Sequence, residues 1–169
     1  AVLSDYHAVM GAIANGHEGT IDRFAGDGIL IFFNDPFPVA QAGRRAATMA
    51  LAMQKEFVPL RKQWLAIGHD LDLGIGIAQG YATLGAFGFE GRQDYSAIGT
   101  VVNLADRLCG EAHGGQILVS SATRDLVGAA LEDVTFQDLG EHRLKDLEHS
   151  QRIFQVIAPG LQTDFPPLA

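Results

Sequence analysis

The sequence predicts an α+β fold in which a mainly antiparallel sheet is covered by helices on one side. Short β-rich runs occur in pairs around glycine-containing turns, as in residues 20–33. Longer segments with helical hydrophobic spacing, such as residues 39–64, separate these pairs. The chain has 169 residues, 47% of them hydrophobic, which is enough for one core and short for two domains.

The first elements are a helix and a hairpin. Residues 5–15 have helical apolar spacing, and Asn15-Gly16 is a typical helix end. Two β-rich runs, residues 20–25 and 28–33, flank Gly26-Asp27, which favours a tight turn. A sheet of this kind is expected to have a strand before the first helix, so we expect this sequence to lack its N-terminal strand.

The middle of the chain predicts a long helix, two strands and a second helix. Residues 39–64 form an amphipathic stripe, which Pro59 is expected to kink or end. Residues 71–78 and 81–84 are predicted strands that form a second hairpin around Gln79-Gly80. The spacing of residues 100–113 predicts a helix that stops at Gly114-Gly115.

The last third of the chain completes the sheet. A strand is predicted at residues 116–120, a short helix at 121–127, and two final strands at 134–138 and 152–157. We therefore predict one domain over residues 1–158, N-terminally incomplete, followed by a loose proline-containing tail at 159–169.

Composition excludes several classes of protein. The net charge of −8 argues against binding to a nucleic-acid backbone, which requires clustered Lys and Arg. A single cysteine excludes an intrachain disulfide, and no apolar run has the roughly 20 residues of a membrane span. We expect a cytoplasmic domain. The sequence also lacks GxxxxGK[ST], CxxC, HExxH and GxSxG patterns, which excludes the enzyme classes that depend on them.

Three stretches, taken together, carry a resemblance to a known family. DRFAGDGILIFF spans the first hairpin, DYSAIGTVVNLADRL enters the helix at residue 100, and EHRLKDL precedes the last strand. In this order they resemble class III adenylyl and guanylyl cyclase catalytic domains of bacterial type. The resemblance implies a ferredoxin-like cyclase fold and a homodimer with composite active sites that converts a nucleoside triphosphate into its 3′,5′-cyclic monophosphate.

The resemblance implies a metal site at Asp27. An Asp-Gly pair in isolation is usually only a turn. In the family, an aspartate at this position holds Mg²⁺ or Mn²⁺, two ions per active site, and hard cations require such oxygen ligands. The family uses a second aspartate, which would lie on a strand preceding Ala1 and is absent from this sequence.

The remaining chemistry is predicted on the second long helix and a later loop. Asn103 and Arg107 are four residues apart and therefore share one helix face, which in isolation would be an ordinary solvated face. The resemblance implies that they position the ribose and stabilise the α-phosphate. Lys145 matches a lysine that contacts the triphosphate, although a loop lysine is commonly only exposed.

Arg23 and Ser96 match the two positions that distinguish the purines. Adenylyl cyclases commonly have lysine with aspartate or threonine there, and guanylyl cyclases glutamate with cysteine. Arg23 keeps the positive charge and Ser96 the hydroxyl, so we expect ATP as substrate and an adenylate cyclase in intracellular signal transduction. Two alternatives stay open, a guanylate cyclase acting on GTP and a catalytically silent domain that only dimerises or regulates. An upstream regulatory or membrane domain also stays open.

Overall fold

A computed structural model describes residues 2–25, 28–35, 37–87, 94–128 and 131–168, with the backbone alone at 25, 84–87 and 94–97. The helices are α1 (Val2–Gly16), α2 (Ala42–Ala66), α3 (Thr100–Glu111) and α4 (Ser121–Val127). The strands are β1 (Thr20–Ala25), β2 (Gly28–Phe32), β3 (Ile75–Ile77), β4 (Thr83–Phe87), β5 (Asp94–Ile98), β6 (Ile117–Ser120), β7 (Thr135–His142) and β8 (Gln151–Ile157). Of these helices, none combines the length and apolar character that a membrane crossing requires.

The strands form one four-stranded sheet and two hairpins. The sheet has the order β3-β6-β8-β7, in which only β3 and β6 are parallel. Antiparallel pairing also joins β1 to β2 and β4 to β5. The predicted α+β class with a mainly antiparallel sheet is therefore confirmed.

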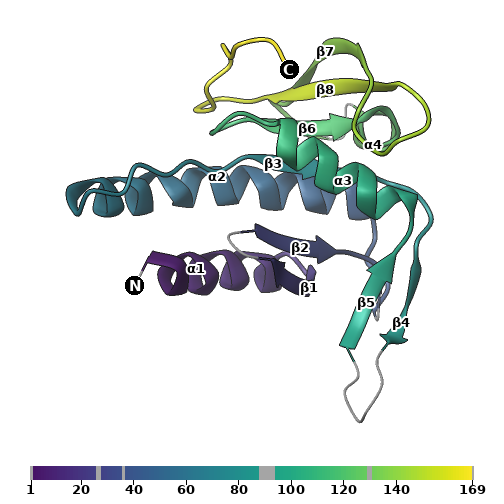
Figure 1. Cartoon of the computed structure of the whole chain (residues 1–169), viewed down its shortest axis with the longest axis horizontal. Helices are drawn as coiled ribbons and strands as arrows, with labels where there is room; N and C mark the ends of the chain where they lie inside the picture. The colour runs from purple at the N-terminus through teal and green to yellow at the C-terminus, as the bar shows by residue number, and fades with distance from the viewer. Residues whose placement is uncertain (1, 26–27, 36, 88–93, 129–130, 169) are drawn as a thin grey trace.

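Helix α2 lies between two layers, with α1 and the β1-β2 hairpin on one side and the four-stranded sheet on the other (Figure 1). Its apolar stripe is buried because it faces both layers. On the first side Met53, Phe57 and Trp64 pack with Met10 of α1, and the rings of Phe57 and Trp64 meet edge to face at 5.4 Å. On the second side Ala50 packs against the sheet.

Helices cover both faces of the four-stranded sheet, so the prediction of helices on one side is wrong. Side chains alternate across a strand. In β6, Ile117 and Val119 pack with Ala50 of α2, whereas Leu118 packs with Leu108 of α3. All four residues of β6 are buried, as is typical of a strand covered on both faces.

The second predicted hairpin is also wrong, because β3 and β4 do not pair with each other. Strand β3 pairs with β6, and β4 pairs with β5. The sequence did not predict β5, since residues 94–98 were given neither a strand nor a helix. Strand β3 is also shorter than the predicted run, since only Ile75–Ile77 pair. Partners far along the chain decide such pairing.

Helix α2 continues through Pro59 to Ala66, so the proline does not end it. A proline inside a helix costs about 3 kcal/mol. Leu60 and Trp64 lie beyond the proline and are 8% and 3% exposed. Burying each stabilises the continued helix by about 1.5–3 kcal/mol, which offsets that cost.

Candidate functional site

Helix α3 presents two of the predicted site residues on one solvent-facing side. The helix begins after Gly99, whose carbonyl accepts the amides of Val102 and Asn103. Asn103 is exposed and Arg107, one turn later, keeps 35% of its side chain exposed. Leu108 is fully buried against the sheet. The apolar side of α3 therefore fixes the helix and directs the amide and the guanidinium outward.

The turn that carries Lys145 is anchored next to this helix. Leu144 and Leu147 are buried in the same cluster as Leu108, and the amide of Leu147 donates to the carbonyl of Leu144 over 3.2 Å. Lys145 and Asp146 form the exposed tip between the two leucines. Asp146 has a φ of 65°, a left-handed conformation that aspartate accepts more readily than most residues.

An ion pair joins the turn to the helix. Nη2 of Arg107 donates to Oδ2 of Asp146 over 2.7 Å, a short charge-assisted contact between residues 39 apart in sequence. Sequence reasoning identified Arg107 and Lys145 but gave Asp146 no role. The acidic neighbour of the lysine in RLKDL was the available signal, and nothing local indicated its partner.

The two positions predicted to read the purine lie on neighbouring strands. Arg23 is on β1, where half of its side chain is exposed and Nη1 lies 3.5 Å from Oδ1 of Asp22. Ser96 is on β5 opposite Gly85, and its side chain is outside the described part of the structure. Strand β1 contacts β5, and β5 leads through Gly99 into α3. The backbone therefore brings these positions toward the helix that carries Asn103.

The metal ligand predicted at Asp27 lies outside the described residues. Elsewhere in the described ranges, no group of three or more His, Cys, Asp or Glu side chains could hold a metal ion. A carboxylate has the donor chemistry that Mg²⁺ and Mn²⁺ prefer. The assignment of Asp27 stays a prediction.

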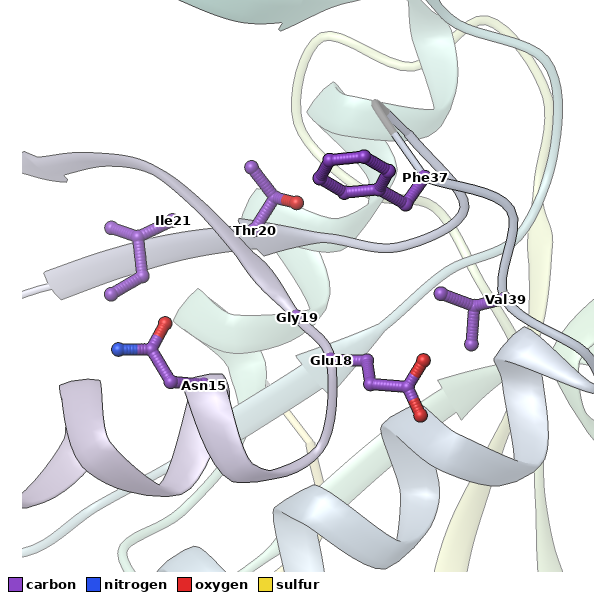
Figure 2. Close-up of a pocket in the computed structure, with 7 residues that line it drawn as sticks. All are labelled: Asn15, Glu18, Gly19, Thr20, Ile21, Phe37 and Val39. Atoms are coloured by element: carbon purple, nitrogen blue, oxygen red, sulfur yellow. The ribbon is translucent and has the colours of Figure 1, made fainter.

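Two hollows in the described part of the chain contain none of the predicted site residues. One, of about 550 Å³, lies between the end of α1, the start of β1 and residues 37–39 (Figure 2). In it Phe37 and Glu18 lie on opposite sides. The other, of about 300 Å³, lies between β7, β8 and residues 163–168. By their own exposure, Asn103 and Lys145 are accessible to solvent in a single chain, and Arg107 is partly so.

Comparison with known proteins identifies a family that shares this arrangement of elements. A family model described as the adenylate and guanylate cyclase catalytic domain matches residues 2–158. Adenylate cyclase 1 of Rhizobium meliloti is 29% identical over 160 residues, which are 93% of this chain and 24% of that protein. The chain thus spans about a quarter of the length of that relative.

Two solved structures match nearly the whole chain. The adenylyl cyclase CyaB from P. aeruginosa is 34% identical with a TM-score of 0.82, over 99% of this chain and 84% of the other. The guanylyl cyclase Cya2 is 31% identical with a TM-score of 0.84, over 95% of this chain and 82% of the other. The predicted fold is therefore confirmed.

Proposed function

Because the chain belongs to the adenylate and guanylate cyclase catalytic domain family, we propose that it is an adenylate cyclase that converts ATP into 3′,5′-cyclic AMP and pyrophosphate. One observation carries the proposal more than any other. The Arg107–Asp146 ion pair places the turn that contains Lys145 beside helix α3, which also carries Asn103. This neighbourhood of helix and turn supports the proposal that the three groups act on one nucleoside triphosphate.

Each of these groups has a distinct role in the proposed reaction. The amide of Asn103 would position the ribose, so that its 3′-oxygen faces the α-phosphorus. The guanidinium of Arg107 would donate to the α-phosphate oxygens, where negative charge grows as the new P–O bond forms. The ammonium of Lys145 would bind the triphosphate tail and stabilise the departing pyrophosphate. The protein contributes positioning and charge, and forms no covalent intermediate.

Asp27 would supply a carboxylate ligand for Mg²⁺ or Mn²⁺, with two ions in each active site. When bound, such ions lower the pKa of the ribose hydroxyl and neutralise the triphosphate. Within this chain, the proposed oxygen donor is the carboxylate of Asp27, which lies between β1 and β2 in the sequence.

We propose a homodimer with two composite sites. Asp27 of one protomer would complete the surface formed by Asn103, Arg107 and Lys145 of its partner. The exposure of Asn103, Arg107 and Lys145 in a single chain supports this arrangement, because a partner protomer could then cover a triphosphate bound to them.

Arg23 and Ser96 support ATP as the substrate. Arg23 keeps the positive charge that adenylyl cyclases commonly have at this position, and Ser96 keeps a hydroxyl group. A guanylate cyclase is the second candidate, favoured by the 31% identity to the guanylyl cyclase Cya2.

Identification of the product tests the proposal directly. The protein is supplied with ATP or GTP at equal concentration, with Mn²⁺ or Mg²⁺, and cyclic AMP and cyclic GMP are quantified. We expect cyclic AMP in excess. An excess of cyclic GMP would support the second candidate, and neither product from a folded protein would indicate a silent regulatory domain.

A further inference from the structure

Asp146 forms an ion pair with the guanidinium of Arg107, the group that the proposed function assigns to the α-phosphate. The distance between Nη2 of Arg107 and Oδ2 of Asp146 is 2.7 Å, with 35% and 65% of the two side chains exposed. Water therefore reaches both groups, and the pair can open without leaving a charge buried. A carboxylate and a phosphate each bind a guanidinium through a pair of oxygens. The N–H donors of Arg107 that bind one of them in this way are therefore not available to the other.

The backbone fixes Asp146 in this position. Leu144 and Leu147, on either side of the tip, are 4% and 8% exposed, and their hydrogen bond closes the turn. The left-handed backbone of Asp146, with a φ of 65°, lies at the tip of this anchored turn. The packed leucines on both flanks thus hold the backbone of Asp146 beside α3, while the side chains of Lys145 and Asp146 both stay exposed.

We propose that Asp146 is a positioning residue that holds Arg107 in the nucleotide-free protein and is displaced by the phosphates of the substrate. This inference rests on the proposed function. The carboxylate keeps the guanidinium over the site, and it competes with the nucleotide for the same N–H donors. Only molecules in which the pair is open present Arg107 to the nucleotide. The apparent affinity is therefore the intrinsic affinity multiplied by the fraction of molecules with an open pair.

Removing the charge of Asp146 should therefore strengthen substrate binding. In an Asp146→Asn variant we expect KM for ATP to fall about two- to sixfold, since an exposed ion pair is only weakly favourable. The kcat should stay within about twofold of wild type, because Asp146 has already left Arg107 when the substrate is bound. Asparagine also accepts a left-handed backbone, so the turn should keep its shape.

The experiment combines turnover with binding of a non-cyclisable probe, α,β-methylene-ATP with Mn²⁺, measured by calorimetry. Asp146→Asn should lower the Kd of the probe by about the same factor as KM. Glu148→Gln is the matched control, because it removes an exposed negative charge from the same loop without touching the Arg107 pair. Glu148→Gln should change the Kd of the probe less than Asp146→Asn does. In an Arg107→Ala background the effect of Asp146→Asn should disappear, since the group for which the two anions compete is gone.

Three outcomes would overturn the inference. Kd is unchanged in Asp146→Asn, or the gain persists in the Arg107→Ala background, or kcat falls more than about fivefold, as a purely supporting role would predict. If wild-type protein makes cyclic nucleotide while any of these holds, only the role of Asp146 fails. If wild-type protein neither binds the probe nor makes product, the proposed function fails as well.

Discussion

Gly76 of β3 and Ala105 of α3 meet backbone to backbone. A β-carbon on Gly76 would lie 2.7 Å from the carbonyl oxygen of Ala105 and would overlap the amide nitrogen of Cys109. Only glycine allows strand and helix to approach so closely. This contact sets the height at which α3 carries Asn103 and Arg107 above the sheet.

Gly76→Ala should therefore destabilise the protein and lower its activity. The added methyl group must displace backbone atoms of α3, at a cost of about 1–3 kcal/mol, and the shift moves Arg107. Gly110→Ala is the matched control, because a β-carbon at that position of the same helix would meet nothing within 4 Å beyond its chain neighbours and the helix's own backbone. It should stabilise by up to about 1 kcal/mol. Urea unfolding and kcat of both variants provide the measurement, and equal stability of the two would contradict the prediction.

Arg107→Ala should lower kcat by about 10²–10³-fold, the scale for losing one preorganised donor to a developing charge. Arg61→Ala provides the control, since Arg61 is an exposed arginine with ion pairs to Asp70 and Asp72 at 3.2 and 2.9 Å. The kcat of Arg61→Ala should equal that of wild type. Rates are measured at saturating ATP and Mn²⁺, with thermal unfolding to show that each variant is folded. A folded Arg107→Ala protein with wild-type turnover would refute the role of Arg107.

Mixing an Asp27→Ala protein with an Arg107→Ala protein should restore activity that neither has alone. In a mixed dimer one composite site keeps both residues intact and the other loses both. Random exchange of subunits would place half of the chains in mixed dimers, so recovery should approach about a quarter of wild-type activity. The activity of the mixture is followed after incubation at equal concentrations. No increase, in samples shown to exchange subunits, would exclude shared sites.

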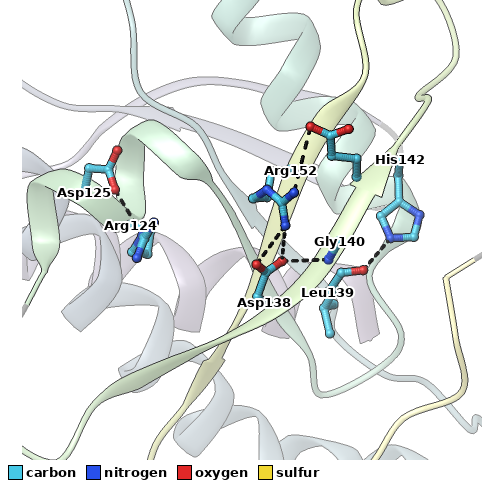
Figure 3. A network of polar contacts seen from close by, with 8 residues as sticks. Arg124, Asp125, Asp138, Leu139, Gly140, His142 and Arg152 are labelled. Carbon is cyan, nitrogen blue, oxygen red and sulfur yellow. Dashed lines mark hydrogen bonds and ion pairs between the residues drawn. The ribbon is translucent and has the colours of Figure 1, made fainter.

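Asp138 should make stability dependent on pH in the acid range. The amide of Gly140 donates to its Oδ1 over 2.8 Å, and Nη1 of Arg152 lies 3.1 and 2.8 Å from its two oxygens (Figure 3). The Gly140 amide above all, and then the Arg152 guanidinium, lower the pKa of this carboxyl below its ordinary 3.8. Because the folded pKa is lowered, the stabilisation is present above pH 3.8 and is lost as pH falls through the folded pKa.

An Asp138→Asn variant should therefore unfold more easily than wild type at neutral pH, and the difference should shrink as the carboxyl of the wild type becomes protonated. Denaturant unfolding at pH 6 and at successively lower pH measures this difference. Glu132→Gln serves as the control for removing one exposed negative charge. A gap between Asp138→Asn and wild type that is the same at every pH would show that the charge of Asp138 is not responsible.

Gln155→Leu should loosen the segment that follows β8. Gln155 is buried, accepts from Nε2 of Gln116 over 2.7 Å and donates to the carbonyl of Thr163 over 2.9 Å. Leucine would leave the buried Nε2 of Gln116 without its partner, at a cost of about 1–3 kcal/mol, and would remove the bond that ties Thr163 to β8. Limited proteolysis should cut residues 159–168 faster in this variant. Gln162→Leu, at an exposed position of the same segment, should be cut like wild type.

Local patterns predicted the elements whose limits depend on neighbouring residues. The short helix α4 was predicted at its observed bounds, and in the structure Ser120 caps its start and Gly128 follows its end. The β1-β2 hairpin follows from a glycine-containing turn between two β-rich runs. The four-residue spacing of Asn103 and Arg107 predicted that they share one face of a helix, and both lie on α3. Their roles stay predictions that the experiments above test.

The sequence by itself determined the four helices and most of the strands, though not β5, because hydrophobic period and turn chemistry act over a few residues. Tertiary structure alone decided that β3 pairs with β6, that α2 and α3 cover opposite faces of one sheet, and that Asp146 holds Arg107. Each of these depends on groups brought together from distant parts of the chain. These contacts depend on burial and charge at positions that become neighbours only in the folded chain. A local sequence pattern therefore does not predict them.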